Sequence, residues 1–164
     1  MSKPNRAVAA GLATFALASF SMTASPSEVQ YNSEWCGHSK TSVLVSSPEL
    51  TVYTQETWGI TPSEFKSDPF RLLTVRCLSF GKIVNGKRSA EGSCSFADPD
   101  GDTFTGLWAS ATGQPNTWNF VVGTGKWKGI QGEGTWRAEM AKKPFADGTT
   151  AYCLVHSGKY TLPQ

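Results

Sequence analysis

Hydrophobic and polar residues alternate with a period of two along much of this chain, as they do in half-buried β-strands. The alternation is clearest between residues 130 and 141, where one face is small or apolar and the other is polar. The first face consists of Gly132, Gly134, Trp136, Ala138 and Met140. We therefore expect Trp136, Ala138 and Met140 to point inward, and Arg137 and Glu139 to point outward.

Eight segments have this strand-like character, and turns rich in Gly, Pro, Asn and Asp separate them. They are Trp35–Val45, Leu50–Trp58, Phe70–Val84, Lys87–Ala97, Thr103–Ala111, Thr117–Val122, Ile130–Ala141 and Thr149–Leu162. No long helical period competes with them. An even number of strands lets the first and last strands pair antiparallel, and closure removes exposed edges. The sequence therefore predicts an all-β fold, an eight-stranded antiparallel β-barrel.

The Asn85-Gly86 pair predicts a two-residue hairpin, because a type I′ turn needs positive φ at both central residues. Opposed residues in such a hairpin have a constant sum of residue numbers, and Cys77 and Cys94 have the same sum as Asn85 and Gly86. They fall on a non-hydrogen-bonded pair, where Cα atoms lie about 4.5 Å apart, within reach of a disulfide. We therefore predict Cys77–Cys94.

The two remaining cysteines, Cys36 and Cys153, then form the second disulfide, which would join the first and last strands. A zinc site is the alternative interpretation of four cysteines. It is disfavoured because the chain has no C-x-x-C pair and its cysteines are widely dispersed. We expect no metal and no cofactor.

The first 24 residues have the pattern of a secretory signal peptide. Lys3 and Arg6 precede an uncharged, mostly apolar stretch at 7–20, which is shorter than the ~20 residues of a spanning helix, and small residues follow. We interpret 1–24 as a signal peptide and 25–164 as a single barrel domain of an exported protein, periplasmic or secreted. No cysteine near the cleavage region would carry a lipid, so we expect no membrane anchoring.

Removing Lys3 and Arg6 from the 15 basic residues leaves 13, which equals the 13 acidic residues. A net charge of zero argues against nucleic acid and against an anionic membrane surface as partners, because both select for a basic excess.

The segment 121–134 contains the run Gly123-Thr124-Gly125-Lys126-Trp127-Lys128-Gly129. It is neither a P-loop nor a dinucleotide-binding motif, because Trp127 follows Lys126 and no helical pattern comes after it. We expect a sharp corner in which Gly123 and Gly125 allow positive φ and Trp127 points inward as a plug. Gly132 and Gly134 then leave room for a neighbouring ring or a strong bend.

This run, together with the acidic turn Asp98-Pro99-Asp100-Gly101-Asp102, resembles the signature region of plant dirigent proteins and the related allene oxide cyclases, and of small bacterial exported barrels. The resemblance covers residues 98–134. It implies an eight-stranded barrel with a central cavity, often assembled as a trimer, so a homo-oligomer is expected. It carries over no active-site residue.

Calcium binding is an alternative interpretation of the acidic turn. An EF-hand loop beginning at Asp98 would need Glu where Ala109 stands, so a hairpin turn with backbone-bonded Asp side chains is favoured. The only two histidines should not form a dyad. With Cys36 opposite Cys153, His38 shares the cysteine face and His156 takes the other face.

Six tryptophans are the best evidence for a ligand. Surplus aromatic rings around a cavity suit a flat or apolar molecule, and we expect Trp108 and Trp136 in its wall. Arg76, Glu56 and His156 are candidate polar groups of the cavity. The chain has no G-x-S-x-G or H-E-x-x-H motif.

Three functions compete. The leading hypothesis is binding of a small apolar or aromatic molecule. The alternatives are a dirigent- or cyclase-like enzyme that guides a reactive intermediate, and a structural or interaction module with a filled core.

Overall fold

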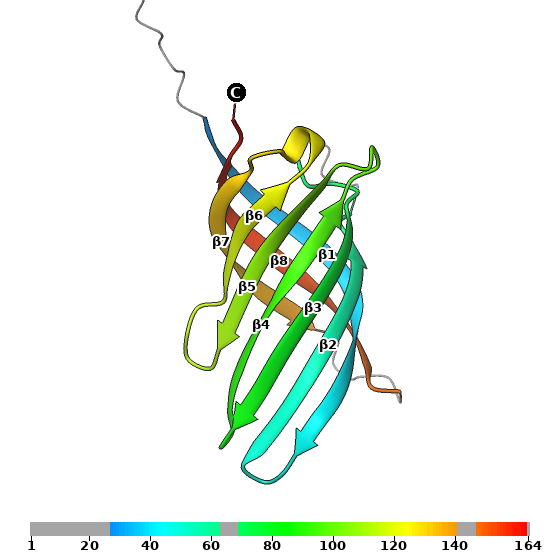
Figure 1. The fold of residues 1–164 in the computed structure, drawn as a ribbon, viewed down its shortest axis with the longest axis vertical. Coiled ribbons are helices and arrows are strands. Elements are labelled where there is room, and N and C mark those ends of the chain that lie inside the picture. The colour runs from blue at the N-terminus through cyan, green and yellow to red at the C-terminus, as the bar shows by residue number, and fades with distance from the viewer. Residues whose placement is uncertain (1–26, 63–68, 141–146, 164) are drawn as a thin grey trace, which may run out of the picture.

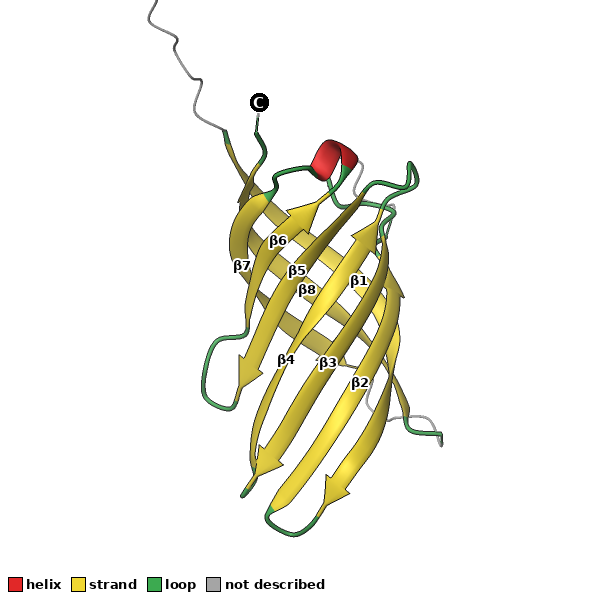
Figure 2. Ribbon diagram, viewed as in Figure 1, coloured by secondary structure: helices red, strands yellow, loops and turns green. Residues whose placement is uncertain are grey.

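Eight antiparallel strands form one closed barrel in chain order, as Figures 1 and 2 show for the computed structural model, which describes residues 27–62, 69–140 and 147–163. The strands are β1 (Glu28–Ser46), β2 (Leu50–Ile60), β3 (Thr74–Val84), β4 (Lys87–Ala97), β5 (Thr103–Ala111), β6 (Thr117–Gly123), β7 (Gln131–Met140) and β8 (Thr149–Thr161). A single 3-10 turn, η1 (Gly125–Trp127), lies between β6 and β7. The all-β barrel predicted from strand alternation is confirmed.

No helix in the described ranges is long and apolar enough to cross a membrane.

Both predicted disulfides are present, and they lie on opposite faces of the barrel wall. Cys77–Cys94 joins β3 to β4, with Asn85 and Gly86 at φ of 48° and 76° as a type I′ turn requires. Cys36–Cys153 joins β1 to β8 where the barrel closes. The first pair is buried inside the barrel, whereas the second is half-buried on the outer face, next to the inward-facing Trp35. Two disulfides are typical of proteins that fold in an oxidising compartment.

Two predicted strand starts were wrong. Strand β1 begins at Glu28 rather than Trp35, and β3 begins at Thr74 rather than Phe70. Residues 69–72 form a turn instead, in which Leu72 has a φ of 57°. The reason is burial of Phe70, whose ring packs within 6 Å of five other aromatic rings. The predicted signal peptide lies outside the described residues.

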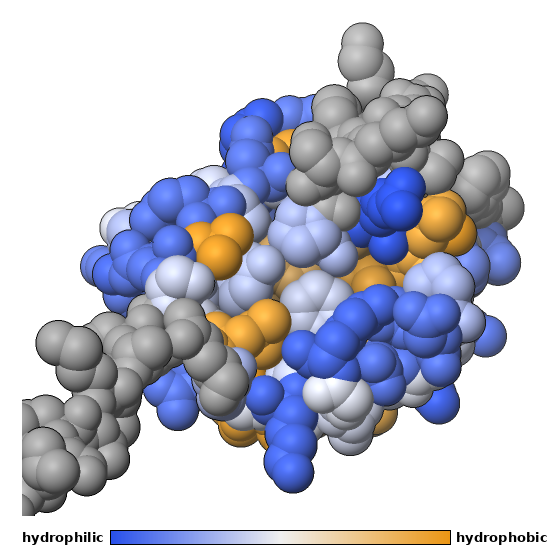
Figure 3. Space-filling model, turned by 90° about the horizontal axis from the view of Figure 1, so that it is seen from above, coloured by the Kyte–Doolittle hydropathy of each residue, from blue (hydrophilic) through white to orange (hydrophobic). Residues whose placement is uncertain are grey.

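One end of the barrel is filled by aromatic side chains. Phe70 and Trp127 stack with ring centroids 5.5 Å apart, and Trp127 is 4% exposed, so the predicted plug is confirmed. The surrounding rings are Tyr31, Phe96, Phe104, Phe120 and Tyr160. Figure 3 views this end, where hydrophilic residues form most of the surface and hydrophobic ones show between them.

The acidic turn and the glycine-rich loop lock this end together. Asp98 accepts hydrogen bonds from Trp127 Nε1 at 3.1 Å and from the backbone amides of Asp100 and Asp102, and its carboxylate pairs with Lys126 Nζ at 2.7 Å. Burial acts to raise the pKa of Asp98, but the hydrogen bonds from Lys126, Trp127 and the two amides outweigh it and hold the pKa below its usual value. The Asp98 carboxylate is thus engaged by protein donors, as expected for a hairpin turn.

Only one of the two corner glycines has the expected backbone. Gly125 has a φ of 51°, and a Cβ there would collide with the Asp102 carboxylate. Gly123 does not have positive φ, and a Cβ on it would meet the backbone of Trp127 instead. The expectation of positive φ at Gly123 was therefore wrong. A glycine is needed there because the backbone of Trp127 lies too close for a Cβ, and not because the chain makes a left-handed turn.

Candidate binding cavity

The half of the barrel away from the aromatic plug encloses a cavity of about 360 Å³. Its lining residues are Trp35, Ser39, Gln55, Thr57, Cys77, Arg88, Cys94, Trp108, Trp118, Trp136, Ala138, Thr150, Tyr152, Leu154 and His156. Trp35, Trp118 and His156 are buried and form its floor, whereas Arg88 and Ala138 are exposed. The cavity therefore opens toward the β1–β2 and β3–β4 hairpins, at the lower end of Figure 1.

Indole rings form one wall and the floor of the cavity. Trp108 on β5 and Trp136 on β7 meet edge to face with centroids 5.5 Å apart, and Trp136 Nε1 donates to the carbonyl of Thr117 at 3.2 Å. At the floor, Trp118 lies against Gly106 so closely that a Cβ there would collide with its ring. Four of the six tryptophans thus face one space.

A polar strip occupies the adjoining part of the wall, from β8 across β1 to β2. Gln55 Nε2 donates to Ser39 Oγ at 3.1 Å, and the hydroxyls of Thr57 and Tyr152 lie 3.0 Å apart. Burial raises the pKa of Tyr152, while hydrogen bonds from Thr57 and Ser39 and the charge of Arg88 act in the opposite direction. An aromatic wall facing hydroxyl and amide groups suits a flat ligand that carries hydrogen-bonding substituents.

His156 sits at the floor, 7% exposed, with Trp35 Nε1 donating to its Nε2 at 3.1 Å. An indole N–H can only donate, so Nε2 accepts and the neutral ring carries its proton on Nδ1. Burial lowers the pKa of His156 to about 4, so the ring is neutral at pH 7. Its Nδ1–H makes no hydrogen bond to a described residue, and the ring lines the cavity.

The residues proposed from sequence as a ligand site separate into two groups. Trp108 and Trp136 line the cavity together with Ala138, while the side chain of Met140 lies outside the described part of the chain. Arg76 and Glu56 do not line it. They form an ion pair on the outer face, with side chains 64% and 33% exposed.

The misplacement of Arg76 and Glu56 has a simple cause. Side chains alternate along a strand, and Arg76 adjoins Cys77, which faces inward. Glu56 likewise adjoins the inward-facing Gln55 and Thr57. The two histidines do lie on opposite faces, as expected: His38 stacks on Trp58 outside the barrel, and His156 lies inside.

Sequence reasoning missed Arg88 and most of the polar strip. Arg88 follows the Asn85-Gly86 turn directly, where a charged residue reads as a solvated hairpin end. One signal was available: Arg88 lies six residues before Cys94 on the same strand, so the two share a face.

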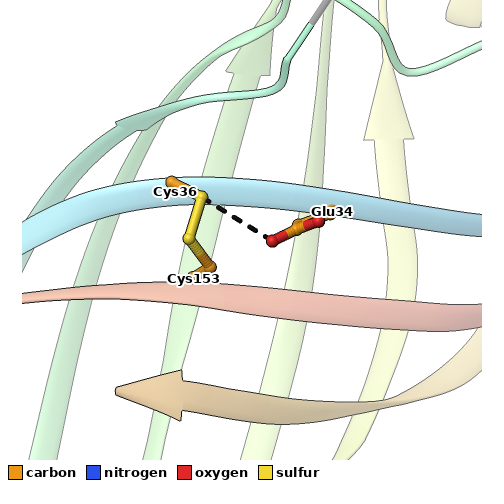
Figure 4. Close-up of side chains that lie close together, drawn as sticks. All are labelled: Glu34, Cys36 and Cys153. Carbon is orange, nitrogen blue, oxygen red and sulfur yellow. Dashed lines mark hydrogen bonds between the residues drawn. A yellow bond between two sulfur atoms is a disulfide. The ribbon is translucent and has the colours of Figure 1, made fainter. Parts of the chain in front are cut away.

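A cluster of three potential metal ligands lies on the outer face, where Glu34 approaches the Cys36–Cys153 disulfide (Figure 4). Glu34 Oε1 is 3.8 Å from Cys36 Sγ. A disulfide sulfur carries neither a proton nor a thiolate charge, so this is a polar contact and the oxidised pair offers no metal-binding thiolate.

Comparison with solved structures identifies the architecture. The pterocarpan synthase dirigent protein GePTS1 superposes with a TM-score of 0.53 at 13% identity, over 90% of this chain and 100% of that one. The chain has a dirigent-like fold. The resemblance stated from the glycine-rich loop is thereby confirmed at the level of fold.

A second pterocarpan synthase dirigent protein, PsPTS1, gives a TM-score of 0.48 at 11% identity over 82% of this chain and 97% of that one. No protein-family model matches the chain. No curated protein matches it either.

Proposed function

We propose that this dirigent-like barrel binds a small aromatic molecule in its cavity, without chemistry of its own. The observation that carries the proposal is the cavity itself, with four indole rings facing about 360 Å³ of space. That volume falls in the usual range of small-molecule sites, roughly 300–1,000 Å³. The described core is therefore not completely filled, which argues against a purely structural module.

Tryptophan fluorescence tests this proposal directly. Trp35, Trp108, Trp118 and Trp136 line the cavity, so a bound aromatic compound should change their emission and raise the melting temperature. Trp58→Phe is the matched control, because Trp58 stacks on His38 outside the barrel and its loss should leave the titration unchanged. If phenolic and aromatic compounds alter neither emission nor melting temperature, the binding proposal fails.

A dirigent- or cyclase-like reaction is the second candidate, and the neutral His156 favours it. A buried N–H donor at the end of an aromatic pocket could hold one oxygen of a reactive intermediate while the walls exclude water. The protein should then change the stereochemical ratio of products that form spontaneously from such an intermediate. Chiral chromatography measures this ratio, and His156→Gln should restore the uncatalysed value while His38→Gln does not.

We further propose self-association through the outer face of β3 and β5. Leu78 and Leu107 are exposed and flank Ser93 on the intervening strand, with Phe80 beside them. A contiguous apolar patch of this kind marks a protein interface, and a second copy of the chain is the occupant expected from the dirigent-like barrel. Sedimentation should show an oligomer that Leu78→Glu dissociates; a monomeric unmodified protein would contradict this.

The compartment is also part of the proposal. The two disulfides agree with export to the periplasm or the medium. Mass spectrometry of the protein from an exporting cell should find a mature N-terminus near residue 25, whereas an intact Met1 would contradict the signal peptide.

A further inference from the structure

Arg88 is the one charged side chain among the described residues that line the cavity. The lining set contains no Asp or Glu, and His156 is neutral at pH 7 because burial lowers its pKa to about 4. Asp98, the buried carboxylate, belongs to the opposite end of the barrel and is engaged by Lys126. Among the described lining residues, the cavity therefore carries one positive charge, at its mouth, and no negative charge.

The position of this charge is built into the barrel rather than left to a free side chain. Arg88 Nε donates to the hydroxyl of Tyr53 at 2.7 Å, and Tyr53 is itself buried. The Tyr53 ring lies directly over Gly81 on the neighbouring strand, where a Cβ would collide with it. Gly81 thus makes room for Tyr53, and Tyr53 holds Arg88.

The terminal donors of the Arg88 guanidinium are not used by the described residues. Its Nε–H is bound to Tyr53, and its two terminal nitrogens make no hydrogen bond or ion pair with any described residue. A guanidinium with two free terminal amino groups has the geometry that recognises a carboxylate. Its charge also reaches into the cavity, because it acts on the hydroxyl of Tyr152 on the far wall.

We propose that the cavity selects aromatic molecules that carry one anionic group, with the ring between Trp108 and Trp136 and the anion on Arg88 at the mouth. This inference rests on the proposed binding function and adds the charge of the ligand to it. Because Arg88 is exposed at the mouth, water screens part of the interaction. The expected gain from the charge is therefore about tenfold in affinity rather than several thousandfold.

The test compares two probes of nearly equal shape, 2-naphthoate and 2-naphthamide, by calorimetry at pH 7 and low salt. Naphthoate, which is ionised at this pH, should bind about ten times more tightly. Arg88→Gln should abolish that preference, and Arg88→Lys should retain part of it. Arg76→Gln is the matched control, because this arginine lies on the outer face and should leave the ratio intact.

Equal affinity of the unmodified protein for both probes would overturn the inference, as would a preference that survives Arg88→Gln. Should Arg88→Gln not fold, the salt dependence of the unmodified protein decides, because only naphthoate binding should weaken with added salt. Binding of naphthamide without a preference for naphthoate defeats this inference alone. Binding of neither probe defeats it together with the proposed function.

Discussion

Lowering the pH from 7 to 5 should destabilise this protein through His156. The group is buried at the cavity floor, and burial lowers its pKa from 6.5 to about 4 in the folded state. Between those two values the unfolded chain binds a proton that the folded protein does not, so the free energy of unfolding falls as the pH falls. Trp35 adds to this effect, because its N–H points at the nitrogen that would have to be protonated.

The magnitude follows from the size of the shift. A full shift of this size corresponds to about 3 kcal/mol, all of it lost below pH 4. At pH 5 the unfolded histidine is almost fully protonated and the folded one is not, which costs about 2 kcal/mol relative to pH 7. That is a large fraction of the stability of a domain of this size. Asp98 does not interfere between pH 7 and pH 5. Its pKa in the folded protein lies below the ordinary value of 3.8, so the stability that it contributes is lost only at a pH below about that value.

The assay is urea unfolding at pH 7 and pH 5, followed by circular dichroism with the disulfides intact. His156→Gln keeps an acceptor for Trp35 but cannot titrate, so it should lose about 2 kcal/mol less than the unmodified protein between the two pH values. His38→Gln, which removes the exposed histidine, should behave like the unmodified protein. Identical pH dependence in His156→Gln and the unmodified protein would refute the reasoning.

Three further predictions concern the backbone and the closed end of the barrel. Gly125→Val should cost roughly 1–3 kcal/mol in urea unfolding, because its φ is positive and its Cβ would strike Asp102. Asp98→Asn should cost about 2 kcal/mol and raise protease sensitivity, because a carboxylate that is 2% exposed loses its charge-assisted bonds to the glycine-rich loop. Leu72→Gly should raise the melting temperature, with a gain of up to about 1 kcal/mol, because an exposed leucine is held at positive φ.

Each of these has its own control. Gly113 also has positive φ but open space around its Cβ, so Gly113→Val should cost less than Gly125→Val; equal losses would mean that Asp102 does not restrict the site. Asp100 is 77% exposed, so Asp100→Asn should change stability little. A loss of stability in Leu72→Gly would show that the leucine side chain contributes more than its backbone strain costs.

The sequence alone was sufficient to predict how β3 pairs with β4 and how β1 pairs with β8 in the barrel wall. The Asn85-Gly86 turn set the β3–β4 register, because two-residue hairpins leave no freedom in how the strands pair, and Cys77 and Cys94 then had to be opposite. Pairing of the remaining cysteines placed β1 beside β8 and so predicted closure. The start of β3 could not be read in this way, because Phe70 leaves the strand for contacts with rings that are distant in the sequence.

For β3 and β4, only the tertiary structure decided which face was the inside. Alternation shows that Arg76 and Cys77 face opposite ways and that Arg88 and Cys94 face the same way, but not which way is inward. Inside and outside are set by how all eight strands curve around a shared volume, and neither disulfide revealed this, since one lies inside and one outside. The polar residues of the cavity could not be recognised from sequence for a related reason. Arg88, Gln55 and Thr57 line the cavity, yet they have the polarity of solvent-exposed strand residues. A cavity that is open to water accepts the same polar side chains as the outer surface does.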